Sequence, residues 1–263
     1  MKKRETIKQA AFGLVAFLAF TAGVSAATAQ SDVMKQIKLP MSSRVMIQKV
    51  AKDYLYIGNE VAVTKARKEM AASLKAFESK QKKLAESLND PKIKNLMMFI
   101  QMNVDEIKET IQQPYSLDNA AVVVDLAEAI SEGELKIADV LKKKLKGKVP
   151  AFKGQRYYVT QIAKYYMAYQ AGLKDDVTVR QMKQSVEKLK KIFKEMTAYP
   201  QNSPEMNRVM NRVDKQWKIV HQFYLDIKEG GLPLIVYQTT NSIEKLLRKY
   251  AKEIIKSKAQ KGK

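Results

Sequence analysis

Apolar side chains recur along this chain with the spacing of an α-helix. Between residues 70 and 84 the mostly apolar positions step by four and three residues, which places them on one face of a helix. The same steps return 112 residues later, between residues 182 and 196. The two stripes are Met70, Leu74, Phe77, Gln81 and Leu84, and Met182, Val186, Leu189, Phe193 and Met196. The pattern therefore predicts two similar amphipathic helices.

The repetition extends beyond these stripes. The segment Ser43 to Leu55 is similar to Gln155 to Met167, and the register continues with one inserted loop residue, so that Asp90-Pro91 corresponds to Ser203-Pro204. Asp and Ser cap helices well, and a proline in the first turn lacks only an N–H that would be unpaired. The matched pairs in the first segment are Arg44/Arg156, Ala51/Ala163, Lys52/Lys164 and Tyr54/Tyr166. The sequence predicts one helical module present twice; chance similarity between Lys-rich and Ala-rich helices is the alternative.

Breaks in the pattern divide each copy into four helices. The expected helices are 41–58, 64–88, 91–112 and 118–145, followed by 154–171, 176–197, 204–228 and 233–257. Short connections favour antiparallel neighbours. The predicted fold is all-α, with two tandem antiparallel four-helix bundles after an N-terminal signal peptide. The predicted domains are residues 40–146 and 151–257, with a seam at Gly147 to Pro150 and a basic tail at 258–263.

Residues 1–29 have the features of a secretory signal peptide. Basic residues precede an apolar stretch from Ala10 to Val24, and small residues suited to signal peptidase follow it. The apolar stretch is shorter than the roughly 20 residues that span a bilayer. We therefore expect an exported, periplasmic protein; a protein anchored in the inner membrane by an uncleaved segment is the alternative.

The formal net charge of +21 predicts anionic partners. Candidates are an anionic membrane surface, an envelope polymer, nucleic acid, or a small anion held inside a bundle. Nucleic acid is the least favoured partner, because the lysines are not interspersed with arginines or aromatic residues and because the protein is expected to be exported. Solubility alone is the alternative explanation of the charge.

The sequence has few residues of the types that usually take part in catalysis. The chain has one histidine, His221, and no cysteine, which excludes the usual zinc and Cys/His nucleophile arrangements. The carboxylates Asp125 and Glu128 lack the accompanying Glu and His residues of di-iron bundles. We expect no enzymatic activity, no catalytic residue, no metal and no cofactor.

Arg44 and Arg156 are the candidate binding residues. Each falls at the start of a predicted, mostly apolar helix, where a guanidinium and the positive helix end together suit a small oxyanion. An arginine that pairs with a neighbouring carboxylate or points into water is the alternative.

These two helices resemble the PilJ/NarX-type sensor domain, the N-terminal domain of type IV pilus methyl-accepting chemotaxis transducers. That family typically has Gln-Arg and apolar residues, then Gln-Arg, an apolar residue, Ala-Lys and often Tyr-Leu. The family's second arginine is Lys49 in the first copy and Gln161 in the second, and its usual preceding glycine is Met41. The matching residues are Arg44, Val45, Met46, Gln48, Val50, Ala51, Lys52, Tyr54 and Leu55, and Gln155, Arg156, Ile162, Ala163, Lys164 and Tyr166.

The resemblance implies an extracytoplasmic sensor bundle, and in nitrate-sensing members an arginine of the first helix binds nitrate or nitrite at a dimer interface. Applied to this chain, the resemblance implies that Arg44, Lys49 and Arg156 are the ligand-binding residues. The candidate ligand is then a nitrate-like anion, and the candidate assembly is a homodimer. No second membrane span or output region follows in this sequence, so we expect a separate membrane receptor or signalling protein as partner. The alternative function is a basic, envelope-associated structural protein that binds anionic lipid or polymer surfaces.

Overall fold

The computed structural model describes residues 3–145, 154–229 and 231–261, with side chains described between residues 31 and 256. Within these ranges the chain is all-α, as predicted, with eight α-helices, one short 3-10 helix and no strand. The helices are α1 Lys3–Gly58, α2 Val63–Ser87, α3 Pro91–Thr110, α4 Leu117–Lys142, α5 Gln155–Gln170, α6 Asp176–Thr197, α7 Pro204–Leu225 and α8 Pro233–Lys261, with η1 at Ile227–Glu229.

Side-chain caps fix several helix starts where the sequence predicted them. Asp90 accepts a hydrogen bond from the backbone N–H of Lys92, and Ser203 accepts one from Met206, with a proline as the next residue in both cases. These caps confirm the predicted starts of α3 and α7. The two predicted stripes are also confirmed, because Phe77 and Leu84 of α2 and all five stripe residues of α6 are buried or nearly so.

The predicted start of the first helix, near residue 41, is wrong. Helix α1 continues upstream through Pro40 to Lys3, although proline removes a backbone donor inside a helix. Tertiary packing outweighs that cost: Ile37 is fully buried, and Gln36 Nε2 donates to the carbonyl of Ser87 at the end of α2 over 3.2 Å. Residues just before Pro40 therefore belong to the packed body. Helix α8 likewise extends past its predicted end at 257.

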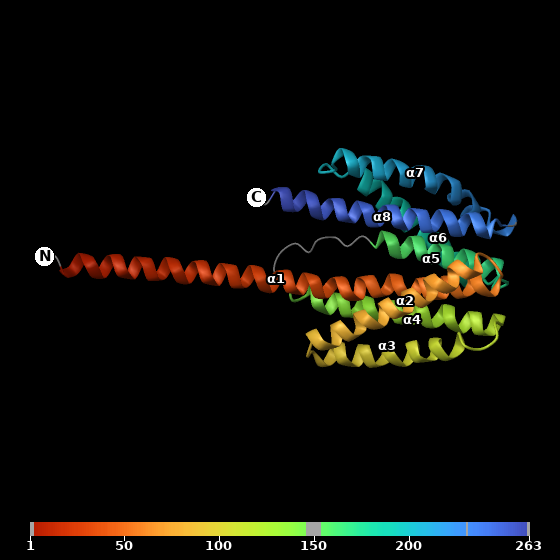
Figure 1. Ribbon diagram of the computed structural model, residues 1–263, viewed down its shortest axis with the longest axis horizontal. Helices are drawn as coiled ribbons and strands as arrows, with labels where there is room; N and C mark the ends of the chain where they lie inside the picture. Colours follow the sequence, from red (N-terminus) through yellow and green to blue (C-terminus); the bar gives the residue numbers. More distant parts are fainter. Residues whose placement is uncertain (1–2, 146–153, 230, 262–263) are drawn as a thin grey trace.

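The helices run up and down along a common long axis, and α1 projects beyond the others (Figure 1). Helix α1 packs against α2 and α4, and α3 packs against α4; in the second half α5 packs against α6 and α8, and α7 against α8. Helices α1 and α5 also pack against each other, so the halves share one continuous hydrophobic core.

The shared core buries the central helices on all sides. Every residue of α1 from Ser43 to Tyr56 is buried, and so is every residue of α5 from Val159 to Ala168. A helix buried all round must place its polar side chains inside the protein, where they need partners. The polar residues between α1 and α5 are therefore the candidates for a functional site.

Two of the sequence-based predictions concern residues outside this central region. The predicted seam at 147–150 lies outside the described residues. Residues 3–29 of the predicted signal peptide fall within α1, and the signal peptide itself stays a prediction. Among the described residues, no helix combines the length and the apolar character needed to cross a membrane.

Candidate functional site

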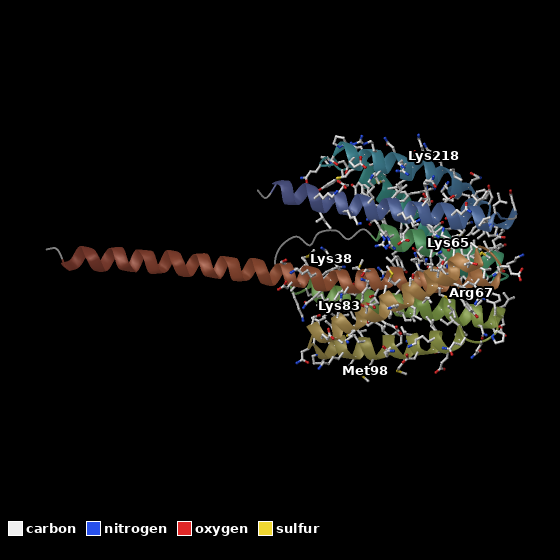
Figure 2. All side chains as sticks on the ribbon, viewed as in Figure 1. Lys38, Lys65, Arg67, Lys83, Met98 and Lys218 are labelled. Carbon is white, nitrogen blue, oxygen red and sulfur yellow. The ribbon has the colours of Figure 1, made fainter. Side chains whose placement is uncertain are left out.

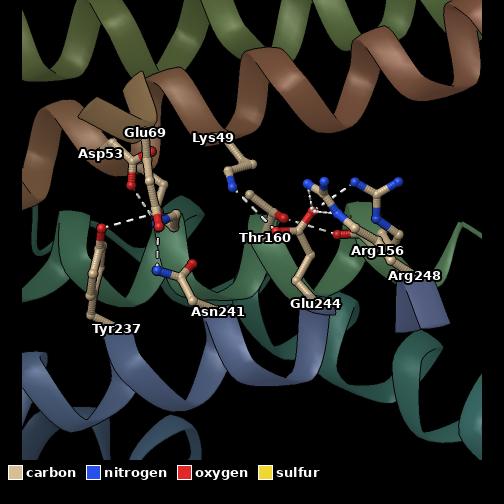
Figure 3. Close-up of polar contacts among 10 residues, drawn as sticks. Lys49, Asp53, Glu69, Arg156, Thr160, Tyr237, Asn241, Glu244 and Arg248 are labelled. Atoms are coloured by element: carbon tan, nitrogen blue, oxygen red, sulfur yellow. Dashed lines mark hydrogen bonds and ion pairs between the residues drawn. The ribbon is translucent and has the colours of Figure 1, made fainter. Parts of the chain in front are cut away.

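A carboxylate held by three cations lies at the contact between α1, α5 and α8. We call Glu244, Lys49, Arg156 and Arg248 the Glu244 site (Figure 3). A Glu244 oxygen lies 3.2 Å from Lys49 Nζ, and its other oxygen lies 2.7 Å from Arg156 Nη2 and 2.8 Å from Arg248 Nη2. The Glu244 side chain is only 6% exposed, so these contacts are largely shielded from water.

The charges around Glu244 keep it ionised. Burial alone would raise its pKa, but the positive charges of Lys49 and Arg156 and the hydrogen bonds from Arg156 and Arg248 lower the pKa to about 2. Three cations face one anion, so the site carries a surplus of positive charge. Among the described residues, Arg156 Nε has no hydrogen-bond partner although it is buried. The site thus has both charge and a donor available for a further anionic group.

A second ion-paired carboxylate, Glu128 of α4, lies where α4 meets α1 and α5, and its side chain is partly buried. We call Glu128, Lys164, Gln161, Gln48 and Tyr157 the Glu128 site. Lys164 Nζ pairs with Glu128, Gln161 Nε2 donates to both carboxylate oxygens at 3.0 Å, Gln48 Nε2 donates at 3.1 Å and Tyr157 Oη at 3.2 Å. Burial would raise the pKa of Glu128, but the charge and hydrogen bond of Lys164 and the neutral donors lower this pKa to about 2. One cation balances one anion.

Arg44 lies apart from the Glu244 site. Its Nε donates to the carbonyl of Ser131 at 3.0 Å, and its guanidinium lies 4.0 Å from the centre of the Tyr157 ring. This arginine therefore joins α1 to α4 and α5 through a hydrogen bond and a cation–π contact. Arg44 lies in the middle of α1 and not at the start of a helix. The prediction that the positive end of a helix lies beside Arg44 is therefore wrong. Arg156, by contrast, is the second residue of α5.

The two arginines reach equivalent places in the two copies. At the 113-residue offset of the later helices, Ser131 corresponds to Glu244, and Arg44 and Arg156 contact these two residues respectively. Glu128 corresponds in the same register to Asn241, which donates to Glu69 of α2 at 3.1 Å. The ion-paired carboxylates Glu128 of α4 and Glu244 of α8 therefore lie one helical turn apart in this register. Glu244 contacts Lys49 of α1, and Glu128 contacts Lys164 of α5.

The carboxylate of Glu134, on α4, has no cation within ion-pair distance among the described residues. Glu134 is fully buried, and Gln81 Nε2 donates to one oxygen while the other oxygen has no partner. Burial raises its pKa to about 8, although the hydrogen bond from Gln81 and the charge of Arg44 act in the opposite direction. Glu134 is thus held in its neutral form near pH 7.

The structure brings together two of the three predicted ligand-binding residues, Lys49 and Arg156, and separates Arg44 from them. Sequence reasoning missed Glu244 and Arg248, and it considered Glu128 only as a metal ligand. A signal was present in the sequence: Glu244 falls on the apolar face of its helix, between Ile243 and Leu247, where an unpaired charge would be costly. A charge on an apolar face indicates a partner charge on another helix.

Within the described residues, no group of three or more His, Cys, Asp or Glu side chains is placed to hold a metal ion. Comparison of the chain with protein-family models, with curated proteins and with solved structures finds no match. The resemblance to the PilJ/NarX-type family rests on residues 43–55 and 155–167 of the sequence and stays a prediction.

Proposed function

We propose that this protein is an exported, non-catalytic sensor or ligand-binding protein of the PilJ/NarX type. It consists of two tandem four-helix bundles and binds a small anionic group between them. The observation that supports this proposal is the convergence of Lys49 from one first helix and Arg156 from the other on a single carboxylate. The sequence predicted those two residues as ligand-binding, and the carboxylate of Glu244 lies between them.

Glu244 is the group that fills this place in the structure. Its carboxylate resembles a small oxyanion in charge and in its hydrogen-bonding oxygens. A ligand could displace Glu244, or bind beside it through the unpartnered Arg156 Nε. Either event changes contacts that join α1 to α5 and α8, because Lys49, Arg156 and Glu244 come from these three helices.

The position of the site suits a sensor. Helix α1 extends beyond the bundle, so a shift of α1 against α5 would be transmitted along a continuous helix. The chain would act through a separate membrane signalling partner that reads this shift. A ligand can move this equilibrium only as far as it binds one arrangement of α1 and α5 better than the other.

A thermal-shift titration tests the proposal. Nitrate, nitrite, sulfate and acetate are compared with chloride at constant ionic strength, since a ligand that binds only the folded protein raises the melting temperature with concentration. We expect at least one anion to raise the melting temperature of the natural protein, and Arg156→Met to abolish the rise. Arg67→Met, at an exposed position of α2, is the matched control and should keep it. If no anion raises the melting temperature beyond the chloride control, the cations serve only the fold and the proposal fails.

A further inference from the structure

The two ends of the helix bundle carry opposite charge. The end at which α1 leaves the bundle is formed by residues 80–95, 136–145, 188–208 and 245–256, and we call it the basic end (Figure 1). These segments contain nineteen lysines and arginines against six acidic residues. The opposite, acidic end is formed by residues 58–69, 105–125, 170–180 and 222–238, which contain seven basic and eleven acidic residues. The large positive net charge of the chain is therefore concentrated at one end.

The acidic residues of the basic end do not neutralise its surface. Four of the six are already paired with a lysine of the same end, in the pairs Asp90–Lys144, Asp139–Lys142, Glu205–Lys249 and Glu253–Lys256. Other lysines there are exposed and have no ion pair among the described residues, namely Lys83, Lys94, Lys143 and Lys252. Figure 2 shows Lys38 and Lys83 at this end and Lys65 and Arg67 toward the other.

The chain itself indicates what this end faces. Helix α1 leaves the bundle there and carries the apolar stretch Ala10 to Val24, while α8 ends on the same side. An α1 retained in a bilayer would hold the basic end against the head groups, and a bundle without that segment would still present the end as one broad cationic surface. Lysine-rich surfaces of this kind are attracted to anionic lipids within a Debye length of about 8 Å at physiological salt.

We propose that the basic end is a membrane-docking surface that binds anionic phospholipid head groups, with the acidic end directed away from the bilayer. The exposed lysines contribute through charge and not through a shaped pocket, so the attraction is broad and sensitive to salt. None of Lys83, Lys94, Lys143 and Lys252 belongs to the Glu244 site. Membrane docking through the basic end and anion binding at the Glu244 site can therefore be tested independently.

Vesicle sedimentation with the full chain tests the surface. Vesicles of phosphatidylglycerol in phosphatidylcholine are compared with phosphatidylcholine alone, at low and moderate ionic strength. One variant replaces Lys83, Lys94, Lys143 and Lys252 with Gln. The matched control replaces Arg67, Lys68, Arg180 and Lys228 with Gln, which removes the same charge from exposed positions of the acidic end. Circular dichroism melting verifies that both variants fold.

We expect the natural protein to bind phosphatidylglycerol vesicles more tightly than phosphatidylcholine vesicles, and salt to reduce the difference. The basic-end variant should lose on the order of a hundredfold in affinity for the anionic vesicles, and the control about threefold or less. Equal losses in the two variants would overturn the proposal, because total charge and not the end would then govern binding. Absence of any preference for anionic vesicles would also overturn it. Binding of soluble polyglutamate through the same four lysines, without vesicle binding, would replace the lipid with a polymer partner.

Discussion

Glu244, which is buried, and Glu128, which is partly buried, are ion-paired carboxylates near the contact between α1 and α5, and the pKa of each is lowered to about 2. Their surroundings nevertheless differ. Glu244 is held by Lys49, Arg156 and Arg248, whereas Glu128 is held by Lys164 and a set of neutral donors. The pKa is thus lowered by three cations in one site, and in the other by the charge and hydrogen bond of a single lysine together with neutral donors.

From this difference we infer that the Glu244 site can exchange its anion and that the Glu128 site cannot. Removal of the Glu244 carboxylate leaves three cations, the buried Lys49 and the partly exposed Arg156 and Arg248, which could pair with another anion. Removal of the Glu128 carboxylate leaves a single fully buried lysine among amides and a phenol. We therefore regard the Glu244 site as the binding site and the Glu128 site as part of the support that joins α4 to α5.

The largest effect is expected from Lys164→Met. This change keeps the volume of the side chain but leaves Glu128 without its fully buried cation. Because Glu128 itself is 24% exposed, we expect a cost at the lower end of that for buried ion pairs, about 3 kcal/mol. Urea unfolding should show a loss of this size in the free energy of unfolding. The double variant Lys164→Met with Glu128→Gln should recover part of it, because no charge then lacks a partner. A single variant as stable as the natural protein would show that Glu128 gains little from Lys164.

Glu134 sharpens the comparison because it lacks the cation that the other two carboxylates have. Its pKa in the folded protein is raised from 4.5 to about 8, so folding favours the protonated form. Its stabilising contribution is complete below about pH 4.5 and is lost as the pH rises toward 8. Relative to Glu134→Gln, the natural protein should lose about 2 kcal/mol of unfolding free energy between about pH 5.5 and 7.5. Parallel pH profiles of the two proteins in urea unfolding would contradict this assignment.

Arg156→Met should have a smaller effect on stability than Lys164→Met. Lys49 and Arg248 remain beside Glu244, so the carboxylate keeps two of its three cations. The Arg156 side chain is also 23% exposed, which weakens the pair through solvent screening. We expect a loss of about 1 kcal/mol in urea unfolding at neutral pH. A loss as large as that of Lys164→Met would remove the distinction between the two sites.

Arg248→Ala should have the smallest effect. Its side chain is 47% exposed and contacts Glu244 four residues earlier on the same helix, and such pairs contribute about 0.5 kcal/mol or less. Thermal denaturation should place this variant within a few degrees of the natural protein. A loss larger than that of Arg156→Met would reverse the ranking of the two arginines.

Much of the fold was predictable from the sequence because helix period and capping residues are local. The caps at Asp90 and Ser203 and the stripes of α2 and α6 depend on neighbouring residues only. The course of α1 through Pro40 was not predictable in this way, because packing of Ile37 and the contact of Gln36 with α2 come from distant parts of the chain.

The site was predictable only in part for the same reason. Lys49 and Arg156 were found from the repeat and the resemblance, but Glu244 lies 195 residues from Lys49 and 88 from Arg156. No local pattern pairs residues at such separations. The charge of Glu244 on an apolar helix face predicts that a partner exists, and the packing of α1 against α5 and α8 is needed to say which one.

The most direct test of the account compares Glu244→Ala with Glu128→Ala in rescue by small anions. Each variant is titrated with acetate and with nitrate against chloride at constant ionic strength, and its melting temperature is recorded. We predict that at least one of the two anions restores several degrees to Glu244→Ala and none to Glu128→Ala, because only the Glu244 site keeps a cluster of cations when its carboxylate is removed. Equal rescue of the two variants, or rescue of neither, would contradict the claim that Lys49 and Arg156 form an anion-binding site.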